Sequence, residues 1–131
     1  MTVVTGDIES HALSIADAAQ ESWRVVGYRA DVLKWDDAAR QLGAEAGAPI
    51  RFTVVVPEMK QIECVIDSNA ELPDAWSALS GLRSGGWIVR AILPVSSMGQ
   101  AHEALRGLDI SLQGWWRAGE NALRFTSPEV P

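Results

Sequence analysis

The run from Gly85 to Pro94 constrains the fold more than any other part of the sequence. Two glycines open this run, a proline closes it, and the residues between are apolar except for Arg90. A short apolar run bounded by turn residues is typical of a buried, central β-strand. Ser97 and Gln100 follow at the spacing of a helix capping box, so a short helix is predicted directly after the strand. A strand that passes into a helix within a few residues indicates an α/β protein.

Two predicted hairpins flank this central strand. Residues 50–56 are rich in β-branched side chains and end at a proline, and residues 61–67 alternate in polarity, so together they predict a hairpin. A helix is predicted to start at Pro73, because proline suits the first helical turn. Residues 108–117 alternate again, and after a turn the alternation resumes at 123–125, which predicts a second hairpin.

The N-terminal part of the chain is predicted to be helical. Residues 10–46 are rich in alanine, and their apolar residues recur at helical spacing. We predict two helical pieces here. Two alternatives are left undecided: one bent helix over this region, or a short strand at 23–28 that leads into a helix over 31–42.

These elements predict an α/β (α+β) protein whose helices pack on a mixed sheet. We expect a two-layer sandwich with about five strands, with the helices mainly on one face and a helical region at the N-terminus. The chain has 131 residues, of which 47% are hydrophobic, which is enough for one domain with a real core. We predict a single domain over 1–131, with a flexible N-terminus at 1–9, a helical region at 10–46 and a sheet-forming region at 50–127.

The alternation of the strands predicts one apolar and one more polar sheet face. The apolar face is predicted to contain Phe52, Val54, Ile62, Cys64, Ile110, Leu112, Leu123 and Phe125. The opposite face is predicted to contain Arg51, Thr53, Gln61, Glu63, Arg90, Ser111, Gln113, Trp115 and Arg124. We expect any functional site on this second face.

Composition excludes several classes of partner. The formal net charge is -6, so the chain repels nucleic acid phosphates and anionic lipid, and we expect neither nucleic acid nor a membrane as partner. The one cysteine, Cys64, forbids an intrachain disulfide and suits a reducing compartment. The sequence has no recognisable secretory signal and no apolar run long enough to cross a bilayer, so we predict a cytoplasmic location. Histidine and cysteine pairs at metal-ligand spacing are missing, and we expect no metal and no cofactor.

Arginines on the polar face are the candidate ligand-binding residues. Arg51, Arg90 and Arg124 could hold an anionic group through bidentate hydrogen bonds, and Trp115 could stack on the ligand. The alternative is that each arginine pairs with an acidic residue on a neighbouring strand, as is common on solvated sheet faces.

Catalytic residues are hard to find in this chain. His102 and Glu103 on the predicted short helix, together with Asp67 at a strand end, are weak candidates for acid/base chemistry. They have no partner at motif spacing, so surface roles are favoured and the sequence favours a non-catalytic protein over an enzyme.

Two adjacent tryptophans predict an interaction surface. Successive strand residues point to opposite faces, so burial of either Trp115 or Trp116 exposes the other unless something covers it. With Arg117 they form the predicted interface on the C-terminal hairpin. We expect a non-catalytic accessory or assembly protein that binds a protein partner or itself, possibly as a homodimer. The alternative is a protein or small enzyme that binds a small anionic ligand on the arginine-lined face.

Overall fold

The structure is a computed structural model and describes residues 4–67, 71–119 and 122–131, with side chains described from residue 11 onward. The helices are α1 (Val4–Val25), α2 (Trp35–Leu42), α3 (Trp76–Ser84) and α4 (Met98–Ala104). The strands are β1 (Asp31–Lys34), β2 (Ile50–Val56), β3 (Gln61–Ile66), β4 (Ile88–Pro94), β5 (Ser111–Arg117) and β6 (Leu123–Phe125). Short 3-10 turns precede α3 and α4 at Leu72–Ala75 and Val95–Ser97, and another, Pro57–Met59, joins β2 to β3.

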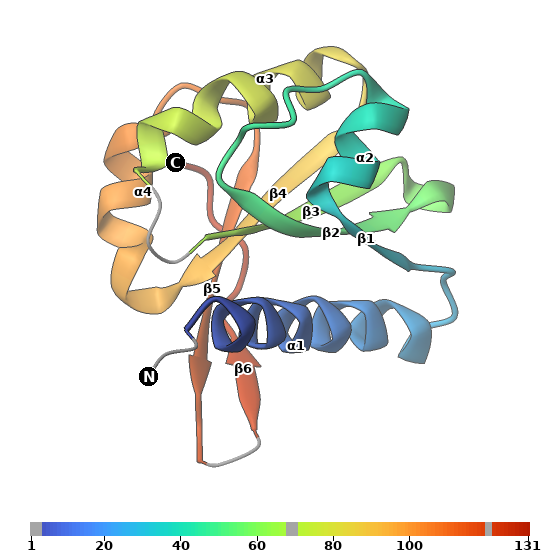
Figure 1. Cartoon of the computed structure of the whole chain (residues 1–131), viewed down its shortest axis with the longest axis vertical. Coiled ribbons are helices and arrows are strands. Elements are labelled where there is room, and N and C mark those ends of the chain that lie inside the picture. Colours follow the sequence, from blue (N-terminus) through green and yellow to red (C-terminus); the bar gives the residue numbers. More distant parts are fainter. Residues whose placement is uncertain (1–3, 68–70, 120–121) are drawn as a thin grey trace.

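The strands lie in the sheet in the same order as in the chain (Figure 1). β3, β4 and β5 are parallel, because α3 and α4 carry the chain back between them. β1, β2 and β3 are antiparallel to one another, and β6 is antiparallel to β5. The mixed sheet and both predicted hairpins are confirmed, with six strands rather than about five.

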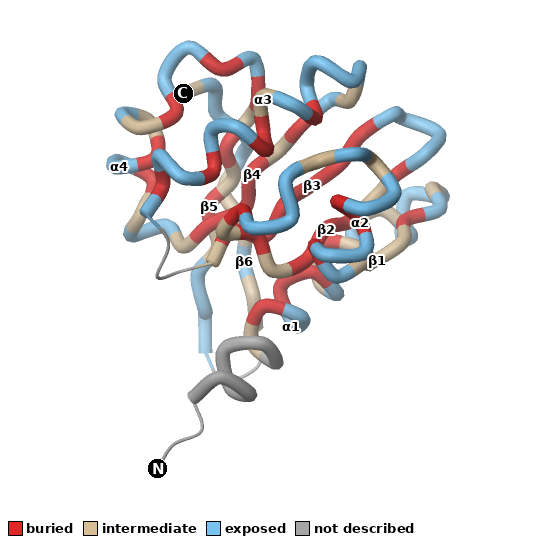
Figure 2. The backbone as a smooth tube through the Cα atoms, turned by 45° about the horizontal axis from the view of Figure 1, so that its top comes forward, coloured by how far each residue is buried: buried red, intermediate tan, exposed pale blue. Residues whose placement is uncertain are grey.

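Helices cover both faces of the sheet, three on one side and α1 on the other (Figure 1). The larger core lies under α2, α3 and α4, where Trp35, Leu79 and Leu105 pack against Ile62 and Cys64 of β3. The smaller core lies under α1 and consists of Ala12, Ile15, Ala16, Ala19, Ala30, Phe52, Val54, Val56, Val65 and Ile92. Buried positions therefore follow the central strands and the inner sides of the helices (Figure 2). The helices lie mainly on one face, as predicted, and α1 adds a layer on the opposite face.

The N-terminal region contains the predicted pair of helical pieces, α1 and α2, and adds a strand between them. α1 runs unbroken to Val25, and Gly27 follows with a φ of 94°, a left-handed conformation that glycine adopts without strain. The strand β1 then lies between α1 and α2. Its four residues are too few to show a period, and pairing with β2 decides their conformation. Helix α1 also begins at Val4, inside the segment expected to be flexible, of which residues 1–3 lie outside the described residues.

The predicted assignment of side chains to the two faces is wrong for part of the sheet. Val54 lies opposite Glu63, so the β2 residues Phe52 and Val54 face α1, whereas Ile62 of β3 faces α2–α4. Opposed residues share a face, and a shift of register by one residue reverses every side chain of a strand. On β6, Leu123 and Phe125 likewise pack on the α1 side, the side opposite Ile110 and Leu112 of the predicted apolar set.

Candidate functional site

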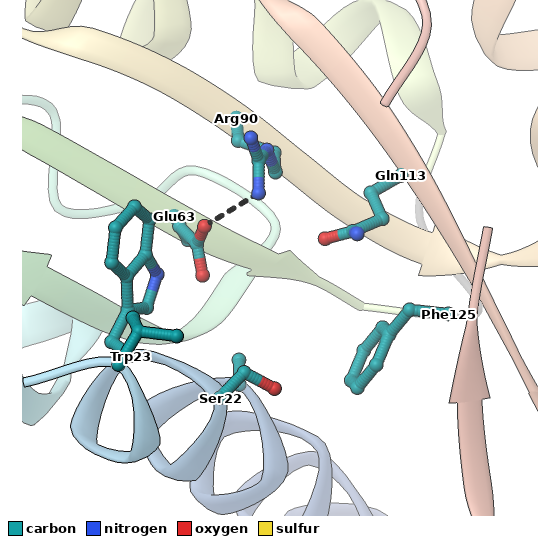
Figure 3. Close-up of a pocket in the computed structure, with 8 residues that line it drawn as sticks. Ser22, Trp23, Glu63, Arg90, Gln113 and Phe125 are labelled. Carbon is teal, nitrogen blue, oxygen red and sulfur yellow. Dashed lines mark hydrogen bonds and ion pairs between the residues drawn. The ribbon is translucent and has the colours of Figure 1, made fainter. Parts of the chain in front are cut away.

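A polar row crosses the middle of the sheet on the face toward α1. Glu63 of β3, Arg90 of β4 and Ser111 of β5 lie directly opposite one another in the strand register. Arg90 Nη1 donates to Glu63 Oε2 at 3.0 Å, and Arg90 Nε donates to Ser111 Oγ at 3.3 Å. Figure 3 shows the ion pair from the side of α1. The register of three parallel strands therefore fixes Arg90 between an acceptor on each neighbouring strand.

Glu63 is a buried carboxylate, with a side chain that is 2% exposed. Gln61 Nε2 donates to the same oxygen, Oε2, at 3.0 Å, and the indole nitrogen of Trp23 on α1 points toward the carboxylate (Figure 3). Burial raises the pKa of Glu63, and the positive charge of Arg90 and hydrogen bonding from Trp23 and Gln61 act in the opposite direction. The raised pKa shows that the cost of burial outweighs these partners.

A cavity of about 270 Å³ opens beside this ion pair. Its walls are Ala19, Ser22 and Trp23 of α1, Val26 directly after α1, Glu63, Arg90 and Gln113 of the sheet, and Phe125 of β6. The cavity exists because both crossover helices, α3 and α4, lie on the other face of the sheet. α1 alone covers this face and makes most of its contacts with β1, β2 and β3, with His11 near its start reaching Trp115 and Arg117 of β5, which leaves a hollow between the rest of α1 and the β5–β6 hairpin (Figure 3).

Gln113 presents a carbonyl oxygen to the cavity. Its Nε2 donates to the backbone oxygen of Thr126 at 2.9 Å, which fixes the orientation of the amide. The oxygen consequently points toward the side of the cavity where Glu63 lies (Figure 3). Ser22 adds a hydroxyl at the opposite wall, where its Oγ donates to the backbone oxygen of Ala18 at 3.1 Å. The cavity thus combines polar groups on the sheet with aromatic and apolar walls.

The predicted arginine-lined face does not form. Arg51 lies at the register shift between Ile50 and Phe52 of β2, pairs with Asp67 at 2.9 Å and does not line the cavity. Arg124 lies on β6 opposite Trp116, on the face away from α1, and is exposed. The physical reason is the register between the strands. It decides which residues of neighbouring strands share a face, and alternation along a single strand does not. Of the three arginines, Arg90 alone lines the cavity.

The tryptophan pair divides between the two faces, as the alternation predicts. Trp115 is half-buried in the core under α1 and packs edge-on against His11, with ring centroids 4.9 Å apart. Trp116 points to the other face and is 39% exposed. Arg117 is exposed, and its Nη2 lies 2.9 Å from His11 Nδ1. Trp115 therefore belongs to the core, and Trp116 is the exposed member of the pair.

The weak catalytic candidates have different partners. His102 on α4 pairs with Glu129 near the C-terminus, with 2.6 Å between Nε2 and Oε1. Asp67 pairs with Arg51, and Glu103 is an exposed residue of α4. Nothing in these contacts assembles an acid/base cluster.

Of the residues around the cavity, the sequence analysis named Arg90 alone as a candidate for ligand binding and missed the others, although Glu63 and Arg90 together carried a usable signal. Each is a lone charge inside an apolar strand, and the two charges are opposite in sign. Buried charges are normally paired, so two such strands predict a contact between them. Trp23, Gln113 and Phe125 carried no such signal, because only packing of α1 and the hairpin brings them to the cavity.

Among the described residues, no group of three or more histidine, cysteine, aspartate or glutamate side chains could hold a metal ion. Nor is any helix in this part of the chain long and apolar enough to cross a membrane. Comparison with protein-family models, with curated proteins and with solved structures finds no match.

Proposed function

We propose that this chain binds a small molecule in the cavity between α1, the Glu63–Arg90 pair and the β5–β6 hairpin. The observation that carries the proposal is a hydrogen-bonded ion pair between a buried carboxylate and a half-buried guanidinium that borders an open cavity. A buried ion pair adds little net stability, and apolar residues of similar volume often serve a core equally well. Convergent polar groups in a concave, partly aromatic wall are what small-molecule sites require.

The size of the cavity limits the ligand. A volume of about 270 Å³ corresponds to about nine water molecules at ~30 Å³ each. A ligand that fills it therefore has about ten non-hydrogen atoms, which is the size of a single ring with a polar substituent. Trp23 and Phe125 supply apolar surface for such a ring, and the polar row of the sheet supplies its hydrogen bonds.

Two adjacent valines at the end of α1 allow a matched test. Both are exposed, at 74% for Val25 and 64% for Val26, but only Val26 lies at the edge of the cavity. A library of small fragments is screened by NMR, with the indole N–H signal of Trp23 as the reporter. Fragments that shift this signal in the wild type and in Val25→Trp should fail to shift it in Val26→Trp, because the larger side chain at the edge of the cavity would block entry. Equal shifts in both variants, or no fragment that binds the wild type, would refute the proposal.

A second candidate function, self-association through the C-terminal hairpin, is supported by the exposure of Trp116. A tryptophan that is 39% exposed on a hairpin at the edge of a sheet is the kind of side chain that anchors protein interfaces. Arg124 lies directly opposite Trp116 on the same face and would contribute to a polar rim, whereas Arg117, the third residue of the predicted interface, points to the α1 side and contacts His11. This function uses the face away from α1, so both proposals can hold for one molecule.

A further inference from the structure

We infer that the cavity selects an uncharged ligand with an amide-type edge, that is, a carbonyl oxygen beside an N–H group, attached to a small apolar ring. This inference rests on the proposed ligand-binding function and names the chemistry that the cavity would recognise. It follows from the charge balance of the walls, from the hydrogen-bonding groups left without partners and from the position of the aromatic side chains.

The charges in the cavity walls cancel. Glu63 and Arg90 are the charged residues among its lining side chains, and their N···O distance is 3.0 Å. A charged ligand would enter this cavity without a counter-charge for it there, because each member of the pair is already neutralised by the other. Burial of an uncompensated charge is costly, so the walls favour a neutral ligand.

Arg90 supplies spare donors. A guanidinium carries five N–H bonds, and Arg90 donates one from Nε to Ser111 and one from Nη1 to Glu63. For the N–H bonds of Nη2, the described residues provide no hydrogen-bonded acceptor. A carbonyl oxygen of the ligand can occupy this place.

Gln113 supplies the matching acceptor. Its amide nitrogen is anchored on Thr126, so the carbonyl oxygen faces the cavity, and none of the described residues donates to it. In the strand register Arg90 lies opposite Ser111, and Gln113 is two residues further along β5 on the same face. Such diagonal neighbours are about 7–8 Å apart at Cα, close enough for one amide group to bridge both side chains.

The oxygen atoms of Glu63 and Gln113 disfavour an anionic ligand, and the guanidinium of Arg90 disfavours a cationic one. A carboxylate ligand would bring its oxygens beside those of Glu63 and Gln113, and a cation would meet the guanidinium of Arg90. Trp23 and Phe125 lie on different sides of the cavity, one on α1 and the other on β6, with room for an apolar ring between them (Figure 3).

Three probes of one shape test the charge preference on the wild-type protein. Benzamide, benzoate and benzamidinium share a ring and a planar three-atom head group, and differ in charge and in their donors and acceptors. Titrations at pH 7, followed by the Trp23 indole N–H signal, should show benzamide binding about tenfold more tightly than either ion, the difference expected for one well-placed hydrogen bond.

Gln113→Leu tests the acceptor. It should weaken benzamide about tenfold, because the N–H of the ligand loses its partner. Gln41→Leu, at an exposed glutamine of α2 on the other side of the sheet, is the matched control and should leave the affinity unchanged. Because the probe series uses the wild type, the inference stays testable if the Gln113 variant fails to fold.

Several outcomes would overturn the inference. Benzoate or benzamidinium as the tightest probe would show that the cavity selects an ion, and the proposed ligand-binding function would still stand. The same conclusion would follow if other fragments bound the wild type but not Val26→Trp, and benzamide did not bind the wild type. Failure of every fragment and every probe would remove the proposed function as well.

Discussion

Glu63 carries its charge in the interior of the sheet, where ionisation costs free energy. Its partners Arg90, Gln61 and Trp23 offset part of that cost, yet burial still raises the pKa of the carboxyl group above 4.5. The folded protein therefore holds a proton on Glu63 at pH values where the unfolded chain has released it. This difference links the stability of the fold to pH.

We predict that Glu63→Gln removes a pH-dependent loss of stability. Because the pKa of Glu63 is raised on folding, its contribution to stability is fully present below about pH 4.5 and is lost as the pH rises through the folded-state pKa. Within that window the free energy of unfolding of the wild type, relative to the variant, should fall by at most about 1.4 kcal/mol per pH unit. Urea unfolding of the wild type and of Glu63→Gln across a pH series measures this change in the free energy of unfolding.

The exposed residue Glu103 provides the control for this experiment. Glu103→Gln should parallel the wild type at every pH. A constant difference between wild type and Glu63→Gln would show that the pKa of Glu63 is the same in the folded and unfolded chain.

Single residues differ in how far the sequence reveals them. The apolar neighbours of Glu63 and Arg90 mark both as buried charges, so their pairing could be predicted. The face of the sheet to which each residue points could not be predicted. Alternation divides the side chains of one strand into two sets, and only the register between strands decides which sets share a face. This is why Arg124 was grouped with Arg90 although the two lie on opposite faces of the sheet.

Strand β5 makes its closest approach to the turn before α4 at Gly114. A Cβ atom added there would lie 3.2 Å from each of three atoms: Met98 Cγ, Val95 Cα and Val95 Cγ2. One of these is backbone and cannot rotate away. The N–H of Gly114 also donates to Thr126 Oγ1 at 2.9 Å, which holds β5 to the segment after β6.

We predict that Gly114→Ala destabilises the protein by about 1–3 kcal/mol, the usual cost of overpacking. The control is Gly99→Ala in α4, where an added Cβ meets no atom within 4 Å. Alanine is the better helix former, so this control should be neutral or stabilising by up to ~1 kcal/mol. Thermal unfolding of both variants measures the change in stability. An unchanged midpoint for Gly114→Ala would show that the turn before α4 relaxes freely.

Most elements were predictable because their periods or boundaries are local. β4 has turn residues on both sides, and the two hairpins alternate cleanly in sequence. β1 was missed because its four residues form a strand by pairing with β2. The capping interaction expected at Ser97 is also not formed: its side chain makes no cap hydrogen bond, and the 3-10 turn Val95–Ser97 leads directly into α4.

The exposed face of the C-terminal hairpin leads to a prediction about the association of copies of this chain in solution. If copies of the chain associate there, Trp116→Ala should weaken the dimer about tenfold or more without lowering the unfolding midpoint, because Trp116 is 39% exposed. Light scattering after size exclusion over a wide concentration range measures the association.

Trp115→Ala is the contrasting variant. It should lower the thermal stability, because Trp115 packs in the core under α1. A monomeric wild type at all concentrations would rule out self-association through this hairpin, and the cavity would then be the remaining candidate for function.

The sequence by itself determined the class of the fold, the central strand, both hairpins and the division of Trp115 and Trp116 between two faces. These features depend on local period and on turn residues, which are properties of neighbouring positions in the chain. The tertiary structure alone decided that α1 covers the face opposite the other helices, and that Trp23, Gln113 and Phe125 meet around the Glu63–Arg90 pair. Such contacts join residues up to about a hundred positions apart, and they depend on strand register and helix packing, which no local pattern specifies.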